Sequence, residues 1–278
     1  MITQDTINQV QAVEHEIMQQ IAAICHRHGL CYFAIGGTAL GAVRHQGFIP
    51  WDDDIDIGMP RKDYEIFLRI AAEELPEQYY LQHFSTEAAS PFYFTKIRKR
   101  NTRFVEYYLK DAPIRQGIFV DIFPFDNVPQ GELQKKLHFR LCRTLYQLYL
   151  CKSLTTVCSS RFTQTDNYKG KMRKILHFLL LPLPKAWLFR WLDRSVQMFN
   201  GKPCTEISHI VRRRLRVKLD DLHPVQFLPF GNYKMPVPNN YDAYLRAQFG
   251  NYDELPPEDK RYGHLPYLVE FEAQGDFL

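Results

Sequence analysis

The sequence predicts an α+β or α/β catalytic domain over residues 1–128, followed by a basic helical region at 129–218 and a C-terminal segment at 219–278. Three observations support this division. Helical and strand patterns alternate with short connections over the first part. An acidic run at 52–56 follows a Gly-Gly pair, which places candidate catalytic residues there. Beyond about residue 131 the patterns become helical and rich in Leu, Phe, Tyr, Lys and Arg.

Apolar spacing and helix-breaking residues define the elements of the first part. Valine and isoleucine recur at helical spacing over residues 5–28, and Gly29 is suited to end that helix. Pro60 is suited to begin a second long helix at 61–75. The other predicted elements are strands at 31–35, 79–84, 92–98, 103–108 and 117–123 and a short helix at 38–44.

The second half is predicted to be mostly helical up to about residue 215. The apolar stretch 175–192 is interrupted by two prolines, Lys185 and Arg190, so it is too broken for a transmembrane helix. Its mixture of Trp, Phe, Lys and Arg favours a segment that lies on an anionic membrane surface. Helices that pack on the catalytic domain with a solvated basic face are the alternative. From residue 226 onward we expect short strands, a helix at 240–249 and a tail that packs back on the catalytic site.

The net charge of +4 hides a strong asymmetry along the chain. Residues 135–218 hold 19 Lys/Arg and 3 Asp/Glu, a net charge of +16, and the rest of the chain carries a net charge of −12. A basic surface of this kind attracts lipid head groups, nucleic acid or phosphorylated glycans. Nucleic acid is disfavoured as a partner, because the basic residues alternate with large apolar ones and no recognition motif is present.

The 45% hydrophobic and 24% charged content indicates a globular protein. Six cysteines without C-x-x-C spacing favour buried free thiols in a reducing compartment. A zinc site formed by His138, Cys142, Cys151 and Cys158 is the alternative. The N-terminal stretch is polar and amphipathic, so we expect a cytoplasmic protein, peripheral on the inner face of the cell membrane.

The acidic run is the strongest functional signal. Alternation over 54–57 predicts a strand with Asp54 and Asp56 on one face and isoleucines on the other. Asp53 should then face away and tolerate substitution, whereas the role of Asp52 stays open. Two carboxylates about 4 Å apart repel by roughly 4 kcal/mol at an effective dielectric constant near 20, so such a pair takes up a proton or a cation. These hard oxygen ligands suit Mg²⁺ or Mn²⁺.

A solvated turn and a calcium-binding loop are the less favoured interpretations of the acidic run. The solvated turn is disfavoured because isoleucines at alternate positions indicate half-burial. A calcium-binding EF-hand loop requires Gly and Glu where this sequence has Ile57 and Asp63.

Two further features complete a nucleotidyltransferase-type layout. The Gly36-Gly37 pair before a helix leaves backbone N–H groups that can hold a phosphate beside Thr38. Such sites usually take a third carboxylate from a neighbouring strand, and Asp121 in the predicted strand 117–123 is the candidate. Asp126 is the competitor, but it follows Pro124 and is expected in a turn.

The stretches Gly36–His45 and Gly47–Met59 resemble the signature of the LicD/fukutin phosphotransferase family. The resemblance continues through residues 61–67, 96–102 and 117–123, and more loosely from 236 to 264. It implies a polymerase-β-like nucleotidyltransferase core, which is a mixed sheet flanked by helices. It also implies Mg²⁺-dependent transfer of a phospho-alcohol, most often phosphocholine from CDP-choline. The acceptor would be a hydroxyl of a cell-surface or lipid-linked glycan, such as lipopolysaccharide, teichoic acid or capsule, and CMP would leave.

Carried onto this chain, the resemblance implies that Asp54 and Asp56 bind Mg²⁺ and that Asp121 is a third ligand or the base for the acceptor hydroxyl. Asp52 is a further candidate ligand. Lys96 and Arg98 are expected to clamp the diphosphate, with an exposed basic strand as the alternative. The full set of candidate substrate-binding residues is Gly36, Gly37, Thr38, Arg44, His45, Trp51, Lys96, Arg98, Arg261 and His264.

Two other functions stay open from the sequence. The same fold could transfer a nucleoside monophosphate from a nucleoside triphosphate to a small-molecule or glycan hydroxyl. A non-catalytic protein that binds membrane or glycan is the third possibility, although the intact acidic residues argue against it. The sequence leaves the transferred alcohol, the acceptor and the oligomeric state undetermined.

Overall fold

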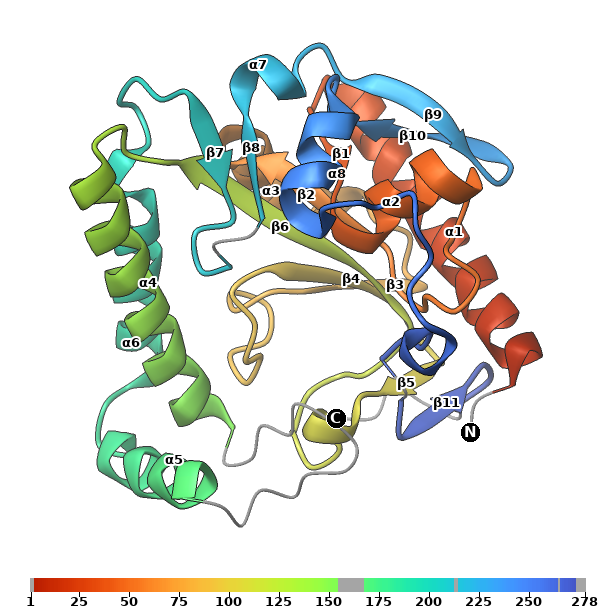
Figure 1. The fold of residues 1–278 in the computed structure, drawn as a ribbon. Coiled ribbons are helices and arrows are strands. Elements are labelled where there is room, and N and C mark those ends of the chain that lie inside the picture. The colour runs from red at the N-terminus through yellow and green to blue at the C-terminus, as the bar shows by residue number, and fades with distance from the viewer. Residues whose placement is uncertain (1–2, 155–167, 213–214, 265, 274–278) are drawn as a thin grey trace.

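The computed structural model describes residues 3–154, 168–212, 215–264 and 266–273. A mixed sheet with the strand order β1-β2-β6-β4-β3 forms its centre (Figure 1). Strands β2 and β6 run parallel, and the other neighbouring pairs of this sheet are antiparallel. The strands are β1 (Phe33–Ala34), β2 (Asp56–Pro60), β3 (Tyr79–Gln82), β4 (Thr95–Lys99) and β6 (Phe119–Asn127). The predicted mixed sheet flanked by helices is therefore confirmed.

One face of this sheet is packed against two helices, and the other carries the polar groups. Helices α1 (Gln4–His28) and α3 (Arg61–Glu74) cover the packed face. Ile57, Ile97 and Ile122 from three neighbouring strands belong to the same buried core as the apolar sides of these helices. Because side chains alternate along a strand, the residues between these isoleucines project from the opposite face.

A second helical layer stands beside the sheet. Helices α4 (Glu132–Ser153) and α6 (Lys185–Val196) lie side by side and share a smaller core that includes Cys142, Tyr149 and Leu192 (Figure 1). Helix α5 (Tyr168–Leu180) packs against α4. The predicted basic region also contributes β7 (Glu206–Ser208) and β8 (Arg216–Lys218), and β7 pairs with β6.

The remaining elements surround the first helix after β1. Helix α2 (Gly36–His45) contacts α8 (Tyr241–Phe249) and the hairpin of β9 (Gln226–Phe230) and β10 (Tyr233–Val237). Near the C-terminus, β11 (Leu268–Glu270) pairs with β5 (Arg103–Val105). The other short elements are α7 (Leu219–Leu222) and the 3₁₀ turns Tyr107–Leu109, Gln197–Phe199 and Glu258–Lys260.

The structure corrects two expectations about the strands. Residues 52–55 lie outside a strand and β2 begins only at Asp56, but burial still alternates as predicted, with Asp54 and Asp56 half-buried and Ile55 and Ile57 buried. Strand β6 continues through Pro124 to Asn127, so the expectation of a turn at Asp126 was wrong. The pairing of Asp126 with Ser208 on β7 extends this strand. Asp126 is fully buried and accepts hydrogen bonds from Arg61 Nε and Nη2, both at 2.8 Å, so it is not part of the acidic cluster.

The structure tests the expected state of the cysteines. The five cysteines within the described residues are free, and Cys25, Cys142 and Cys151 are buried. Cys158, needed for the alternative zinc site, lies outside the described residues, and no cluster of His and Cys suited to zinc is found within them.

Among the described residues no single helix is long and apolar enough to cross a membrane. The stretches Gly170–Leu180 and Lys185–Phe199 pass that test only as a pair bent by 105°.

Candidate active site

The carboxylates of the acidic run meet Asp121 on the polar face of the sheet. Asp56 pairs with Asp121 in the parallel register of β2 and β6, and Asp121 pairs with Lys96 on β4. Three neighbouring strands thus place Asp56, Asp121 and Lys96 in one row. Asp54 lies close enough to Asp56 to influence its ionisation. The structure therefore brings together the three carboxylates expected from the sequence.

The ionisation of these carboxylates shows how crowded they are. Burial raises the pKa of Asp56 well above its usual value, and the charges of Asp54 and Asp121 raise it further. Burial also raises the pKa of Asp54 and of Asp121. Burial, with the charges of Asp54 and Asp53, raises the pKa of Asp52 to about 9. Groups in this situation bind a cation or a proton, since either relieves the repulsion.

The Gly-Gly pair allows the start of α2 to approach this cluster closely. A Cβ at Gly36 would lie 3.7 Å from Asp56 Oδ2, and a Cβ at Gly37 would lie 2.5 Å from Asp52 Oδ2. Gly36 also has a φ of +53°, which favours glycine. The Thr38 hydroxyl accepts a hydrogen bond from the Asp56 N–H at 2.8 Å. Thr38 thus fixes the first residue of β2, and the two glycines leave room for the carboxylates.

The two basic residues expected to clamp a diphosphate have partners within the protein. Lys96 Nζ donates to both carboxylate oxygens of Asp121, at 2.7 and 2.9 Å. Arg98 donates to Gln82 Oε1 at 2.7 Å and to the Gly117 carbonyl at 2.6 Å. Both side chains are buried, so the alternative of an exposed basic strand was wrong. Lys96 orients Asp121, and Arg98 joins β4 to the start of β6.

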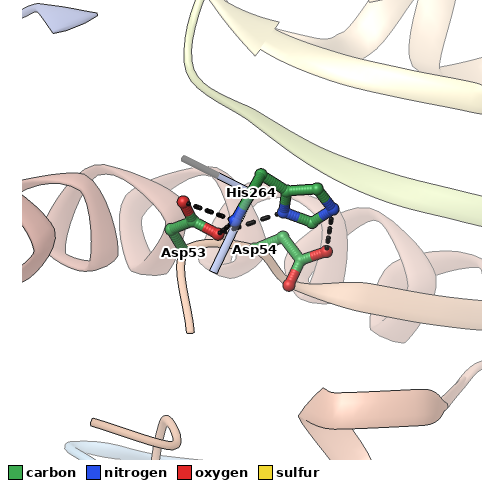
Figure 2. A group of neighbouring side chains, drawn as sticks. All are labelled: Asp53, Asp54 and His264. Atoms are coloured by element: carbon green, nitrogen blue, oxygen red, sulfur yellow. Dashed lines mark hydrogen bonds and ion pairs between the residues drawn. The ribbon is translucent and has the colours of Figure 1, made fainter. Parts of the chain in front are cut away.

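The C-terminal segment reaches the acidic run through His264 (Figure 2). The His264 backbone N–H donates to Asp53 Oδ1 at 2.8 Å, and His264 Nδ1 lies 3.0 Å from the same oxygen. His264 Nε2 lies 3.7 Å from Asp54 Oδ2. Asp53 is buried and holds this contact, so the expectation that it faces away and tolerates substitution was wrong. Burial does alternate through this run, but the sequence did not reveal that the C-terminal segment covers the side on which Asp53 lies.

Asp53, Asp54 and His264 also form the group of described residues whose ligand atoms lie close enough to share a metal ion. In the metal-free protein, the carboxylate of Asp54, and then that of Asp53, raise the pKa of His264 well above its usual value. In that state His264 is a countercharge for the two carboxylates, and its hydrogen bonds to Asp53 attach the C-terminal segment to the acidic run.

Asp54, Asp56 and Asp121 are the magnesium ligands expected from the sequence, but among the described residues their ligand atoms do not all lie within 4.8 Å of one another, as those of Asp53, Asp54 and His264 do. Within the described part of the chain, no hydrogen bond or ion pair satisfies the Asp56 carboxylate, although it is partly buried beside two other acids. A divalent cation would satisfy this group, and carboxylate oxygens are the ligands that Mg²⁺ prefers. Asp52 lies against Gly37, and its carboxyl group influences the ionisation of Asp54. Asp52 could therefore support the metal ligands without binding the ion itself.

Four further predicted residues lie together at the edge of the site. Arg44 donates to the carbonyl oxygens of Tyr252 and Glu254, at 2.7 and 3.3 Å, and Arg261 lies over the ring of Trp51 at 5.5 Å. The ring of His45 is 6.4 Å from that of Trp51. Arg44, His45, Trp51 and Arg261 therefore connect α2 to the C-terminal segment. Contact with a donor by these residues stays a prediction.

A cavity of about 1170 Å³ opens beside Asp56. Gly36 and Asp56 line one part of it, and residues of α4 line another. Among the described residues that line the cavity, Asp56 is the one carboxylate, against four cations. The cations are Lys136, Arg140, Arg143 and Arg212.

Sequence reasoning missed two residues of this site. Arg212 faces the acids: burial lowers its pKa, but Tyr146 and the carboxylates of Asp56 and Asp121 raise it by more. In the sequence, Arg212 belongs to a run of arginines, which indicated only that this region is basic. Glu14 lies fully buried on α1, and burial followed by the charges of Asp54 and Asp53 raises its pKa well above the usual value. An acid among the inward-facing apolar positions of a predicted helix would have signalled it.

Comparison with known proteins identifies sequences that are similar to this chain. Residues 29–145 match the model of the nucleotidyltransferase domain of the LicD/FKTN/FKRP family. The chain is 27% identical over 267 residues to the lipopolysaccharide cholinephosphotransferase LicD of Haemophilus influenzae, which covers 93% of this chain and 96% of that protein. An uncharacterized protein of Rickettsia typhi is 36% identical over 69 residues, 25% of this chain and 22% of that protein. These matches confirm the resemblance to the LicD/fukutin family that was found from the sequence.

The crowding at Asp56 generates a prediction about metal binding. Saturating MgCl₂ should raise the melting temperature of the wild-type protein, because a cation that binds only the folded state stabilises it by about 2.7 kcal/mol at a hundred times its dissociation constant. Asp56→Asn should lose most of this shift. In EDTA the same variant should melt at or above the wild-type temperature, since it removes one of several repelling charges. Differential scanning fluorimetry measures both, with Asp111→Asn as an exposed control; an unchanged magnesium shift in Asp56→Asn would contradict the assignment.

The His264 contact generates a prediction about pH. The folded pKa of His264 is raised, so its ion pairs stabilise the protein fully below the unfolded pKa of about 6.5 and this contribution is lost as pH rises through the folded value. His264→Gln should therefore lower the melting temperature by about 2 °C at pH 6, and by less at high pH. His26→Gln, at an exposed position of α1, is the control. A difference that grows with pH would refute the ion pair.

Proposed function

We propose that this chain, in which residues 29–145 match the model of the LicD/FKTN/FKRP nucleotidyltransferase domain, transfers phosphocholine from CDP-choline to a glycan hydroxyl with release of CMP and dependence on Mg²⁺. The acceptor is a cell-surface or lipid-linked glycan, with lipopolysaccharide favoured by the name of the Haemophilus relative. In the reaction, the acceptor oxygen forms a bond to the phosphorus that carries choline. The bond from that phosphorus to the oxygen bridging to CMP breaks.

The observation that carries this proposal is the Asp56 carboxylate, partly buried, crowded by two other acids and open to a large cavity. Phosphoryl transfer requires positive charge close to the reacting phosphate and little covalent chemistry from the protein. A crowded carboxylate without a partner among the described residues supplies the place for a metal that provides such charge. The agreement with a cholinephosphotransferase over nearly the whole length of both chains supports the choice of transferred group.

The residues divide the work according to their positions. Asp54 and Asp56 would hold Mg²⁺, which would neutralise charge on the donor diphosphate. Asp121 would complete the ligand set or accept the proton of the acceptor hydroxyl, and Lys96 orients its carboxylate for either role. Gly36 and Gly37 keep side chains out of the space in front of the acids. Arg212 and Asp56 line the same cavity, so an anionic phosphate bound there could contact Arg212 directly.

A membrane location is part of the same proposal. Ten of the large apolar residues exposed to solvent belong to α4, α5, α6 and their connections, although these helices make up a small part of the chain. Lys171, Lys174, Arg190 and Arg194 lie among them. Exposed Trp and Leu mixed with basic residues are typical of helices that rest on an anionic membrane. The apolar residues are Leu133, Leu137, Leu141, Met172, Ile175, Phe178, Leu179, Leu181, Trp187 and Trp191.

The reaction predicts a specific product from a specific donor. The wild-type protein with Mg²⁺ and a lipopolysaccharide acceptor should release CMP from CDP-choline faster than from CDP-ethanolamine, CDP-ribitol or CDP-glycerol. Asp54→Ala and Asp56→Ala should each reduce the rate by about 100-fold or more, since each removes a group that positions transition-state charge. Chromatography of the nucleotide product measures this, with Asp111→Asn as the control. Full CMP release by the two Ala variants would end the proposal, and pyrophosphate from a nucleoside triphosphate would establish nucleotidyl transfer instead.

The membrane location predicts lipid-dependent flotation. The protein should float with vesicles that contain about 30% phosphatidylglycerol, a composition chosen for the assay, and stay unbound with pure phosphatidylcholine vesicles. Trp187→Ala combined with Trp191→Ala should reduce the bound fraction by about tenfold, because two interfacial aromatic side chains are lost. Phe227→Ala combined with Leu255→Ala removes exposed apolar side chains elsewhere and serves as the control. Equal binding to both kinds of vesicle, or an equal loss in both double variants, would count against this surface.

A further inference from the structure

One side of the cavity beside Asp56 is lined by cations that the transfer reaction itself does not require. Lys136, Arg140 and Arg143 lie on the solvent-facing side of α4 and line this cavity. Their spacing of three and four residues places them on one side of the helix. Within the described residues, none of the three side chains has a hydrogen-bonding or ion-pair partner in the protein. The α4 wall, defined as these three residues, therefore presents unneutralised positive charge to whatever occupies the cavity.

The position of the wall separates it from the site of the donor diphosphate. The reacting phosphate must lie against Asp54, Asp56 and Asp121. Asp56 lies on β2 of the central sheet, whereas the three cations lie on α4, which packs on α6, so the acid and the cations line different parts of the cavity. A ligand that contacts both parts must extend away from the metal-binding acids along the cavity.

The size and the surface of the cavity fit an extended sugar chain. Small-molecule pockets usually measure about 300–1,000 Å³, and this cavity of about 1170 Å³ is larger. Aromatic and aliphatic side chains, including Phe139, Tyr146 and Phe249, lie between the cations in its lining. Apolar ring faces suit the carbon-bound hydrogens of sugars, and the guanidinium groups suit phosphate or carboxylate groups in a two-pronged contact.

We propose that the α4 wall is the acceptor subsite of this enzyme and that it binds a glycan carrying phosphate or carboxylate groups near the hydroxyl that is modified. This inference rests on the proposed function, since it takes the second substrate of that reaction to be a glycan. It adds to that function the charge class of the acceptor. It also gives the basic middle of the chain a role inside the cavity, separate from the membrane contacts of α5 and α6.

Binding of a lipopolysaccharide core oligosaccharide tests this proposal without catalysis. The probe is used intact, after phosphatase treatment and after carboxyl reduction, and its affinity for the full-length protein is measured by calorimetry in EDTA. Arg140→Gln combined with Arg143→Gln should weaken binding of the intact oligosaccharide by about tenfold or more, the loss expected when two charge-assisted hydrogen bonds are removed. The treated form that loses affinity for the wild-type protein identifies phosphate or carboxylate as the bound group. Lys62→Gln combined with Arg69→Gln on α3 makes the same change of charge at exposed positions elsewhere and should bind normally.

Steady-state kinetics show whether the α4 wall binds the acceptor or the donor. They also keep this test separate from the test of the proposed function. The Arg140/Arg143 double variant should raise the KM for the oligosaccharide by about tenfold while the KM for CDP-choline changes by less than about twofold, and Arg140→Lys with Arg143→Lys should recover part of the loss. A rise in the KM for CDP-choline alone would overturn the proposal, because the wall would then belong to the donor. Equal affinity for the intact and both treated oligosaccharides would also overturn it. If the wild-type protein binds the oligosaccharide through these arginines but releases no CMP, the proposed reaction fails and the anionic glycan site stands.

Discussion

Repulsion among closely packed carboxylates is the constraint on which the rest of this structure depends. Burial and neighbouring negative charges together raise the pKa of five acidic side chains that face one another. A bare cluster of this kind would cost more free energy than the fold can supply, unless protons or cations compensate. The protein supplies part of the compensation itself, with Lys96 on Asp121 and His264 beside Asp53 and Asp54. The five acids are Glu14, Asp52, Asp54, Asp56 and Asp121.

The same constraint explains why distant segments meet at this point. Gly263 precedes His264 where a Cβ would collide with the Asp53 carboxylate, so the C-terminal segment approaches the acidic run through a residue without a side chain. Gly36 and Gly37 allow the equivalent approach from α2. Charge attraction brings His264 in, and the glycines remove the steric obstacle. Catalytic geometry here is therefore built by several chain segments that each contribute one close approach.

The sequence predicted what local patterns control and missed what distant contacts control. Apolar spacing predicted α1 and α3 within one or two residues, and the alternation in 117–123 placed Asp121 on the polar face beside Asp56. Asp53 was misassigned because its partner His264 lies 211 residues away in the sequence. No local signal reports such a contact. Lys96 and Arg98 were placed correctly on one face, but only the structure shows that protein groups already occupy them.

The charge asymmetry of the chain acquires a spatial meaning in this fold. Asp56, from the part of the chain with a net charge of −12, and three cations of α4, from the part with a net charge of +16, line the same cavity. If these charged groups served only to attract each other, we would expect direct ion pairs between them, because an ion pair recovers the cost of desolvation only at short range. They are instead held apart, by the sheet on one side and by the packing of α4 on α6 on the other. A gap of this kind favours a ligand that presents phosphate charge to both surfaces, toward a bound cation on the acidic side and directly toward arginine on the basic side.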